Sequence, residues 1–244
     1  MPLLRLQARV PVGIEFPEAM RHAVTYVLEG EYESGHDGSG LTILDIGANV
    51  GSFALWALRR WPGSEVHSYE PNPETFALLR RNLLGIGHVH CINAAVYPIT
   101  SSDKAGFFAR YAGDGEAALL SYASDTFRES IVEATHMVDV VTPASLPRAD
   151  VIKIDIEGGE ATVLEALDLS SASLVLAEFQ NGRSRLQMQA KLARAGFIAI
   201  RDEACPWDPI LDFQDYRRDL MGDVYGHMFY ERCGQTRLVR ANTI

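Results

Sequence analysis

Buried strands and amphipathic helices alternate along most of this chain. The apolar run at 42–46 predicts a strand buried on both faces, and the spacing of apolar residues over 53–60 predicts a helix directly after it. The same order recurs downstream, with strands expected at 65–71, 88–96, 150–156, 174–179, 197–202 and 226–233 and helices at 17–30, 73–83, 160–167 and 186–195. This alternation predicts a doubly wound, mostly parallel α/β sheet.

Residues 97–148 depart from that alternation. The segments AGFFARY, ALLSYA and HMVDVVT have the pattern of short strands and are separated by Gly, Ser and Asp. We expect a β-rich antiparallel insertion, placed as a lid, in which His136 and Tyr111 are candidates for lining a substrate pocket. Further along, a late loop offers an apolar wall built from Trp207, Phe213 and Tyr216.

Composition narrows the function mainly by exclusion. The chain has 244 residues, of which 47% are hydrophobic and 22% charged, and its formal net charge is −10 with only three lysines. This balance argues against a nucleic-acid or anionic-membrane partner, because both bind clustered Lys and Arg. Three cysteines without CxxC spacing and the lack of a long apolar run predict reduced thiols and a soluble cytoplasmic protein.

The stretch TILDIGANVG carries the first candidate chemistry. A strand that passes through a glycine turn into a helix predicts a site where backbone N–H groups around Gly47 hold an anionic ligand group. Asn49 stands where a dinucleotide fingerprint has its second glycine, which weakens the case for NAD. Glu70 follows Gly51 by 19 residues and is expected to accept hydrogen bonds from ribose hydroxyls, as NAD or S-adenosylmethionine requires.

Charged residues interrupt the strand that follows the insertion. Lys153, Asp155 and Glu157 alternate with isoleucines, so a period of two places all three charged side chains on one face. Asp155 and Glu157 then lie at the carboxyl end of a central strand, and Glu178, near the end of the next strand, reaches the same crevice. A structural ion pair of Lys153 with Asp155 or Glu160 is the alternative interpretation.

Seven sequence motifs carry a family resemblance. VLEGEY, LDIGANVGSF, YEPNPETFALLRRNL, INAAV, VTPASLP, VIKIDIEGGEATVLEAL and LAEFQ follow one another over about residues 26–200. Their order and spacing resemble those of the FkbM family of S-adenosylmethionine-dependent methyltransferases. The resemblance implies a class I, Rossmann-like sheet of seven strands with an antiparallel last strand. We expect one methyltransferase domain over 1–244, with residues 1–40 as a lead-in with one helix.

The same resemblance implies an activity, and the residues themselves suggest how the site performs it. It implies methylation, usually of a hydroxyl on a sugar, natural product or other small molecule. Asp155 is expected to face the methionyl part of the cofactor or the reacting hydroxyl, with Glu157 or Glu178 as general base. Glu31 and Tyr32 match a family element and are expected to close over the cofactor. Cofactor contacts are predicted at Asp45, Gly47, Asn49, Gly51, Ser52, Glu70, Pro71, Asn72, Asn93, Ala94 and Asp155.

Several alternatives stand beside this prediction. Asp155, Glu178 and Asn181 offer oxygen ligands for Mg²⁺, but their spacing is not diagnostic and no metal is predicted. A nucleotide-dependent oxidoreductase is an alternative, although no tyrosine has a lysine four residues later and no GxxxxGK[ST] loop occurs. A non-catalytic binding subunit is another. Gln180 stands where family members often have His, and histidines such as His227 are expected to be structural.

Overall fold

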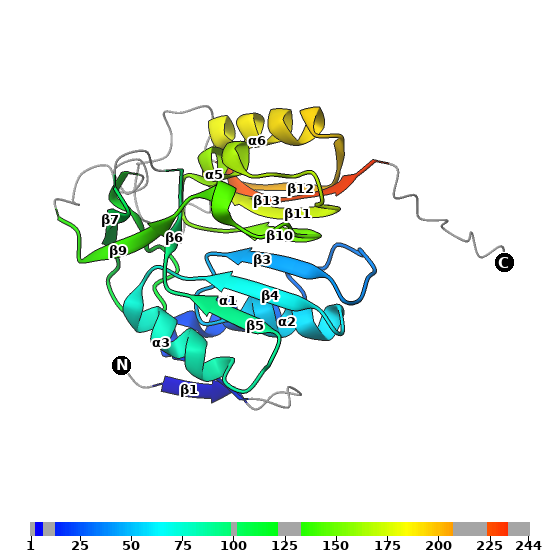
Figure 1. The fold of residues 1–244 in the computed structure, drawn as a ribbon. Coiled ribbons are helices and arrows are strands. Elements are labelled where there is room, and N and C mark those ends of the chain that lie inside the picture. The colour runs from blue at the N-terminus through cyan, green and yellow to red at the C-terminus, as the bar shows by residue number, and fades with distance from the viewer. Residues whose placement is uncertain (1–2, 7–12, 99–101, 122–132, 207–223, 234–244) are drawn as a thin grey trace.

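A seven-stranded sheet forms the centre of the protein (Figure 1). The structure is a computed structural model that describes residues 3–6, 13–98, 102–121, 133–206 and 224–233. The strand order is β12–β13–β11–β10–β3–β4–β5. In chain order the strands are β3 (Thr42–Ile46), β4 (Glu65–Tyr69), β5 (Val89–Ile92), β10 (Val151–Ile154), β11 (Leu174–Phe179), β12 (Phe197–Pro206) and β13 (Val224–Arg232).

The direction of the strands agrees with the predicted fold class. β3 pairs in parallel with both β4 and β10, and β10 pairs in parallel with β11. The last strand, β13, is antiparallel to its neighbours β11 and β12. The predicted seven-stranded, mostly parallel sheet is therefore confirmed, with the antiparallel last strand that the family resemblance implies.

Helices cover both faces of this sheet (Figure 1). On one side lie α1 (Arg21–Glu29), α2 (Ser52–Arg60) and α3 (Pro73–Asn82), and on the other α5 (Glu160–Ala166) and α6 (Gly182–Arg194). Helix α1 ends at Gly30, whose φ of 111° is left-handed. Helix α3 begins where the Asn72 side chain accepts hydrogen bonds from two backbone N–H groups, with Pro73 in its first turn. Two 3₁₀ turns are η1 (Glu18–Met20) and η2 (Pro143–Ser145).

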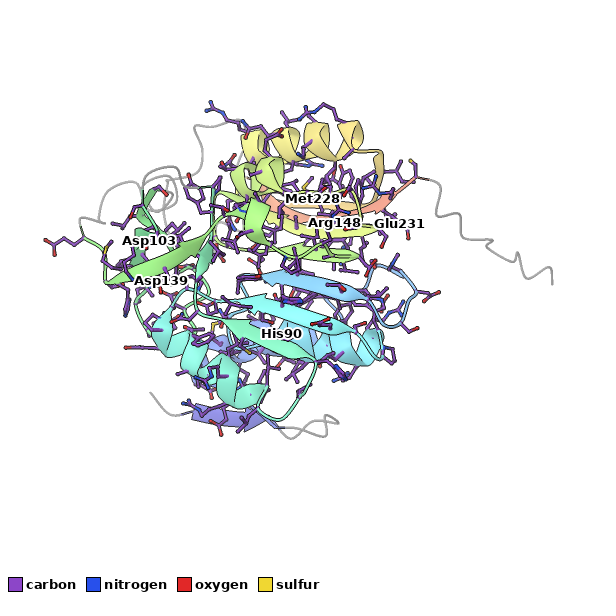
Figure 2. All side chains as sticks on the ribbon, viewed as in Figure 1. His90, Asp103, Asp139, Arg148, Met228 and Glu231 are labelled. Atoms are coloured by element: carbon purple, nitrogen blue, oxygen red, sulfur yellow. The ribbon has the colours of Figure 1, made fainter. Side chains whose placement is uncertain are left out.

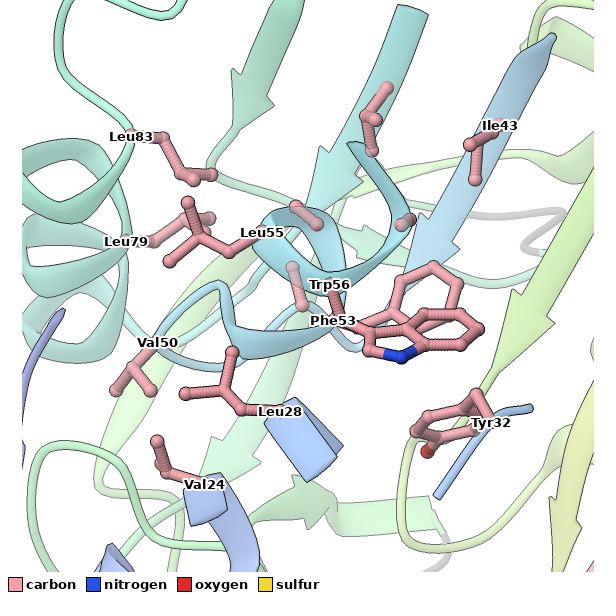
Figure 3. Close-up of a cluster of buried hydrophobic side chains, with 14 of the residues drawn as sticks. Val24, Leu28, Tyr32, Ile43, Val50, Phe53, Leu55, Trp56, Leu79 and Leu83 are labelled. Carbon is pink, nitrogen blue, oxygen red and sulfur yellow. The ribbon is translucent and has the colours of Figure 1, made fainter. Parts of the chain in front are cut away.

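Alternate residues of the central strands form two separate apolar cores. On β3, Ile43 faces the core under α1 to α3, whereas Leu44 and Ile46 face the core under α5. Figure 3 shows the first core, where Leu28 of α1 lies near Phe53 and other apolar residues of α2. Full burial of each large apolar side chain contributes about 1.5–3 kcal/mol. These cores hold the carboxyl ends of the strands in place.

The insertion forms a second, smaller sheet in the order β6–β9–β7–β8. Its strands are β6 (Ala95–Val96), β7 (Lys104–Phe108), β8 (Ala118–Leu119) and β9 (His136–Val141). β7 pairs antiparallel with β8 and β9 as predicted, but β6 is parallel to β9. The expected strand at 88–96 is split, because the chain turns at Asn93, whose amide donates to the carbonyl oxygens of Glu70 and Pro71. The small sheet stands beyond the carboxyl ends of β3 to β5 (Figure 1).

The lead-in is more regular than its sequence indicates. β1 (Leu3–Leu6) and β2 (Ile14–Pro17) pair antiparallel next to α3, which β2 contacts. Within the described residues, no helix is both long and apolar enough to span a bilayer.

Candidate active site

A cavity of about 240 Å³ opens at the carboxyl ends of the central strands. Its floor comes from the turn after β3, the end of β4 and the segment after β10. Residues on the apolar face of α1 and residues of the insertion form its walls. Seven of the predicted cofactor-contact residues line it, namely Gly47, Asn49, Ser52, Glu70, Pro71, Ala94 and Asp155. The three predicted catalytic residues Asp155, Glu157 and Glu178 line it too.

The glycine turn is shaped by a close backbone approach. Gly47 has a φ of 82°, and a Cβ atom built there would lie 1.7 Å from the carbonyl oxygen of Asp155. Asn49 also adopts a positive φ, of 48°, which is uncommon for a residue with a side chain. Only glycine therefore lets the turn after β3 pass against the segment after β10, and this contact brings the two halves of the cavity floor together.

The N–H groups of this turn are already used inside the protein. The N–H groups of Gly47 and Ala48 donate to the carbonyl oxygen of Tyr69, at 3.1 and 2.9 Å. The N–H of Asn49 donates to a carboxylate oxygen of Glu70 at 2.9 Å. The prediction that N–H groups around Gly47 hold an anionic ligand group is therefore wrong for these three, because Tyr69 of β4 and Glu70, which follows it, supply their acceptors.

Glu70 braces the floor of the cavity. It is buried, and its two carboxylate oxygens accept hydrogen bonds from the N–H groups of Asn49 and Asn72, at 2.9 and 2.8 Å. Burial raises the pKa of Glu70 to about 7, against the opposing effect of these hydrogen bonds. Each carboxylate oxygen can accept a second hydrogen bond, so a position remains on each oxygen for a ligand.

Four predicted cofactor contacts do not line the cavity but support it from behind. Asp45 is fully buried and accepts a hydrogen bond from Ser68 at 3.1 Å. Gly51 is the residue before α2 and packs closely against Leu79. Asn72 caps α3, and Asn93 holds the turn between β5 and β6.

Lys153 is the centre of a buried charged network. Its ammonium lies 3.5 Å from a carboxylate oxygen of Asp45 and 3.5 Å from one of Asp155, and it donates to the carbonyl oxygen of Gly47 at 2.6 Å. Burial by itself would lower the pKa of Lys153, but the charges of Asp155 and Asp45 outweigh it and raise the pKa. Lys153 therefore forms the alternative structural ion pair with Asp155. Glu160 instead accepts a hydrogen bond from the N–H of Gly158.

The three predicted catalytic carboxyl groups meet in space, with oxygen atoms all within 4.8 Å of one another. Burial raises the pKa of Glu178 well above its usual value, and the charges of Asp155 and Glu157 add to the shift. Burial also acts to raise the pKa of Asp155, but Lys153 and a hydrogen bond from Glu178 lower it. Within this pair the surroundings therefore favour the protonated form of Glu178 and the ionised form of Asp155. Glu157 adopts a φ of 57° and accepts a hydrogen bond from Gln180 at 3.1 Å.

A second set of titratable side chains, Glu31, Tyr32 and His227, borders the cavity beside this cluster. The Tyr32 hydroxyl donates to Asp155 at 3.1 Å, and its ring lies edge-on to His227. His227 Nε2 lies 3.3 Å from a carboxylate oxygen of Glu31. Burial, with the charge of Asp155, raises the pKa of Glu31 to about 7. Glu31, Tyr32 and His227 all line the cavity. Glu31 and Tyr32 therefore lie where the expectation that they close over a ligand requires them.

The sequence did not point to His227. β13 is antiparallel to β11, and their register places His227 directly opposite Glu178. No periodicity within GHMFYERC shows that register, so the cavity position of His227 is a result of tertiary structure. The spacing of apolar residues in the first helix predicted that α1 has an apolar face. It did not predict that this face lines the cavity.

The side of the cavity formed by α1 and the insertion is mostly apolar. Residues of α1 and of the insertion line it, among them Val24, Val27, Phe107 and Leu119. His136 and Tyr111 do not line it, so that prediction is wrong for this cavity. β9 contributes no lining residue, and the segment after β7 contributes Asp114 and Gly115 instead. The predicted wall of Trp207, Phe213 and Tyr216 lies outside the described residues.

Comparison with known proteins gives one consistent result. The sequence model described as the methyltransferase FkbM domain matches residues 45–204. Methyltransferase sdnD of Sordaria araneosa is 27% identical over 206 residues, which cover 68% of this chain and 77% of sdnD. The 31-O-demethyl-FK506 methyltransferase FkbM of Streptomyces tacrolimicus is 27% identical over 199 residues, which cover 67% of this chain and 75% of that protein.

Solved structures show the same fold. The crystal structure of P. horikoshii TYW2 in complex with MeSAdo aligns with 94% of this chain and 70% of its own, with a TM-score of 0.52 and 9% sequence identity.

Proposed function

This chain belongs to the FkbM methyltransferase family, and on that premise we propose that it methylates a hydroxyl group of a small molecule. The family and the fold imply S-adenosylmethionine as the methyl donor. That the methyl acceptor is a hydroxyl group is our proposal, and it is argued from the residues that line the cavity. The observation that carries it is the position of ionised Asp155 beside two further acid groups and His227 at the carboxyl ends of the strands.

The residues of the cavity fit such a cofactor. The side-chain oxygen of Asn49 is buried and has no hydrogen-bond donor among the described residues, which leaves it available to a donor on a ligand. Glu70 keeps one acceptor position on each oxygen, which suits the two hydroxyls of a ribose. Gly47 adds no side chain of its own to the floor. When bound, S-adenosylmethionine supplies a methyl group attached to a positively charged sulfur.

The chain's own residues then have three tasks. Asp155, ionised and held by Lys153 and Tyr32, places a fixed negative charge at the floor, which favours a positively charged ligand group. Glu178 is protonated and donates to Asp155, so it orients Asp155 rather than accepting a proton. The apolar residues of α1 and the insertion exclude water from the cavity. The cavity also aligns the acceptor with the methyl group, and such alignment can lower the activation barrier by several kcal/mol.

A hydroxyl must lose its proton during methyl transfer, and we assign that step to the Glu31–His227 pair. Glu31 has a pKa of about 7, which suits a general base at neutral pH. Its carboxylate lies 3.3 Å from His227 Nε2, so the pair can share a proton taken from the acceptor. This assignment replaces Glu178 as base, whereas Glu157 remains a second candidate on the same cavity edge.

The acceptor is proposed to be a small molecule rather than a nucleic acid. The net charge of −10 and the small number of lysines do not suit binding to phosphate backbones. The relative from Streptomyces tacrolimicus is named for methylation of an oxygen on FK506, which supports a natural-product hydroxyl as the first class to test. A cytoplasmic location belongs to the same proposal.

The decisive experiment incubates the full-length protein with S-adenosylmethionine and a panel of hydroxylated small molecules, including macrolides and glycosides. Release of S-adenosylhomocysteine with methyl ether formation in the product supports the proposal. Methylation at nitrogen would overturn the hydroxyl assignment. Calorimetric titration with S-adenosylmethionine and with NADH runs in parallel. Binding of NADH alone would favour the oxidoreductase alternative, and S-adenosylmethionine binding without turnover on any acceptor would favour a non-catalytic subunit.

A further inference from the structure

A cluster of two imidazoles and one carboxylate lies on the central sheet away from the cavity. We propose that Glu65, His67 and His90 bind a divalent transition-metal cation of the zinc class. None of the three residues lines the cavity. Glu65 begins β4 and His90 lies on β5, the strand at one end of the sheet order, as Figure 2 shows for His90. The site is thus separate from the proposed methyl-transfer chemistry.

The strand register brings the three ligand groups together. His67 and His90 are Cα partners on the parallel strands β4 and β5. Their rings stack with centroids 4.6 Å apart and an angle of 18° between planes. Glu65 precedes His67 by two residues and so projects from the same face. One oxygen of Glu65 lies 2.6 Å from His90 Nε2 and 3.6 Å from His67 Nε2.

The donor set indicates the class of cation. One ligand atom from each of the three residues lies within 4.8 Å of the others, which suits a single ion. Two imidazole nitrogens and one carboxylate oxygen form a common zinc-binding set. Imidazole ligands favour Zn²⁺, Co²⁺, Ni²⁺ or Cu²⁺ over Mg²⁺ and Ca²⁺, which prefer oxygen ligands. A nitrogen-containing set therefore distinguishes this cluster from the all-oxygen cluster in the cavity.

The exposure of the cluster suits metal binding. The Glu65 and His90 side chains are 48% and 50% exposed, so solvent can complete the coordination.

A cation at this position would join two strands. It would bind the native arrangement of β4 and β5 and not the separated residues of the unfolded chain. Binding to the native state alone raises the apparent stability in proportion to the logarithm of ligand concentration. The expected role is therefore to stabilise the β5 end of the sheet.

The test is a calorimetric titration of the untagged full-length protein with Zn²⁺. We expect one saturable equivalent, weakened about ten-fold or more in Glu65→Gln and in His67→Asn, and abolished when His67→Asn and His90→Asn are combined. Zn²⁺ at about 100 times its dissociation constant should raise the melting temperature by roughly 5–10 °C. His22→Asn is the control, because His22 is an exposed histidine on α1, and it should bind Zn²⁺ like the unchanged protein.

Co²⁺ gives an independent spectroscopic readout. The unchanged protein should develop the visible absorption bands of a low-coordinate Co²⁺ site, and the double variant should not. Circular dichroism verifies that the variants fold. If a histidine variant does not fold, Glu65→Gln replaces it in the test, because the Glu65 side chain is exposed. Absence of saturable Zn²⁺ binding would overturn the proposal. Zn²⁺ binding that survives the double variant but disappears in Asp155→Asn would also overturn it, by assigning the ion to the cavity.

Discussion

Lys153, which is buried, and Asp155, which is partly exposed, form an ion pair in which the ammonium lies 3.5 Å from a carboxylate oxygen. The same ammonium donates to the carbonyl oxygen of Gly47 and faces Asp45 of the neighbouring strand. One cation therefore connects the glycine turn to the acidic cluster. Because both parts of the proposed site share this connection, their relative position does not depend on a bound ligand.

Replacement of this cation should destabilise the fold strongly. Lys153→Met leaves the buried Asp45 without its positive partner, and breaking a buried pair in this way costs about 3–5 kcal/mol. Urea unfolding measures the change. The control is Lys104→Met, whose pair with Asp139 is exposed, and it should have no measurable effect. Equal stability of the two variants would contradict the role assigned to Lys153.

Neutralisation of Asp155 should separate binding from turnover. Asp155→Asn keeps the shape of the side chain but removes the negative charge at the cavity floor. We expect turnover to fall by about 10²-fold or more, while cofactor affinity changes less than ten-fold, because Glu70 and Asn49 remain. Product release and calorimetric titration measure the two quantities. Asp139→Asn, on exposed β9, is the control. Near-normal turnover in Asp155→Asn would rule out this role.

Two glycines with nearly the same positive φ test the close approach at the turn. Gly47 and Gly85 have φ values of 82° and 83°, but only at Gly47 would a Cβ atom meet another atom, at 1.7 Å. Gly85→Ala should cost about 1–2 kcal/mol from backbone strain alone. Gly47→Ala should cost more and also abolish cofactor binding. Thermal unfolding and calorimetry provide the comparison, and identical behaviour of the two variants would show that the contact is unimportant.

Stability should decrease as the pH rises from about 4.5 to above 7. Glu160 is fully buried, and burial raises its pKa from 4.5 to about 7. A raised carboxyl pKa means that the folded state binds the proton more tightly, so its contribution is complete below 4.5 and is lost above 7. The contribution is up to about 3 kcal/mol.

The matched variant for this effect is Glu160→Gln, which resembles the protonated side chain. Its free energy of unfolding should depend less on pH over this interval than that of the unchanged protein. Urea unfolding at pH 5 and pH 8 measures the difference. The same pH dependence in both proteins would contradict the assignment to Glu160.

Turnover should increase with pH through about 7. The pKa of Glu31 is raised to about 7, mainly by burial, so the fraction of Glu31 able to accept a proton increases between about pH 6 and 8. Glu31→Gln should remove this rise and lower the maximal rate, whereas cofactor affinity should remain. A full pH–rate profile with the identified acceptor tests this. An unchanged profile in Glu31→Gln would assign the base elsewhere, with Glu157 as the next candidate.

The sequence by itself determined the sheet and most of the acids. Apolar runs such as Ile43–Ile46 are buried on both faces of a parallel sheet, so they identify the strands without knowledge of their neighbours. The ends of these strands share one edge of the sheet, and this placed Asp155, Glu157 and Glu178 in a single crevice. Local patterns were sufficient because strand position and direction follow from burial and connection length.

Tertiary structure decided which groups these acids contact. The register of β13 against β11 brings His227 opposite Glu178, and the packing of α1 places Tyr32 on Asp155. Lys153 faces Asp45 because β10 and β3 are neighbours in a particular register. These contacts join residues far apart in the chain, and burial shifts their pKa values. Neither the contacts nor the shifts can be read from local residue patterns, because both depend on the three-dimensional surroundings.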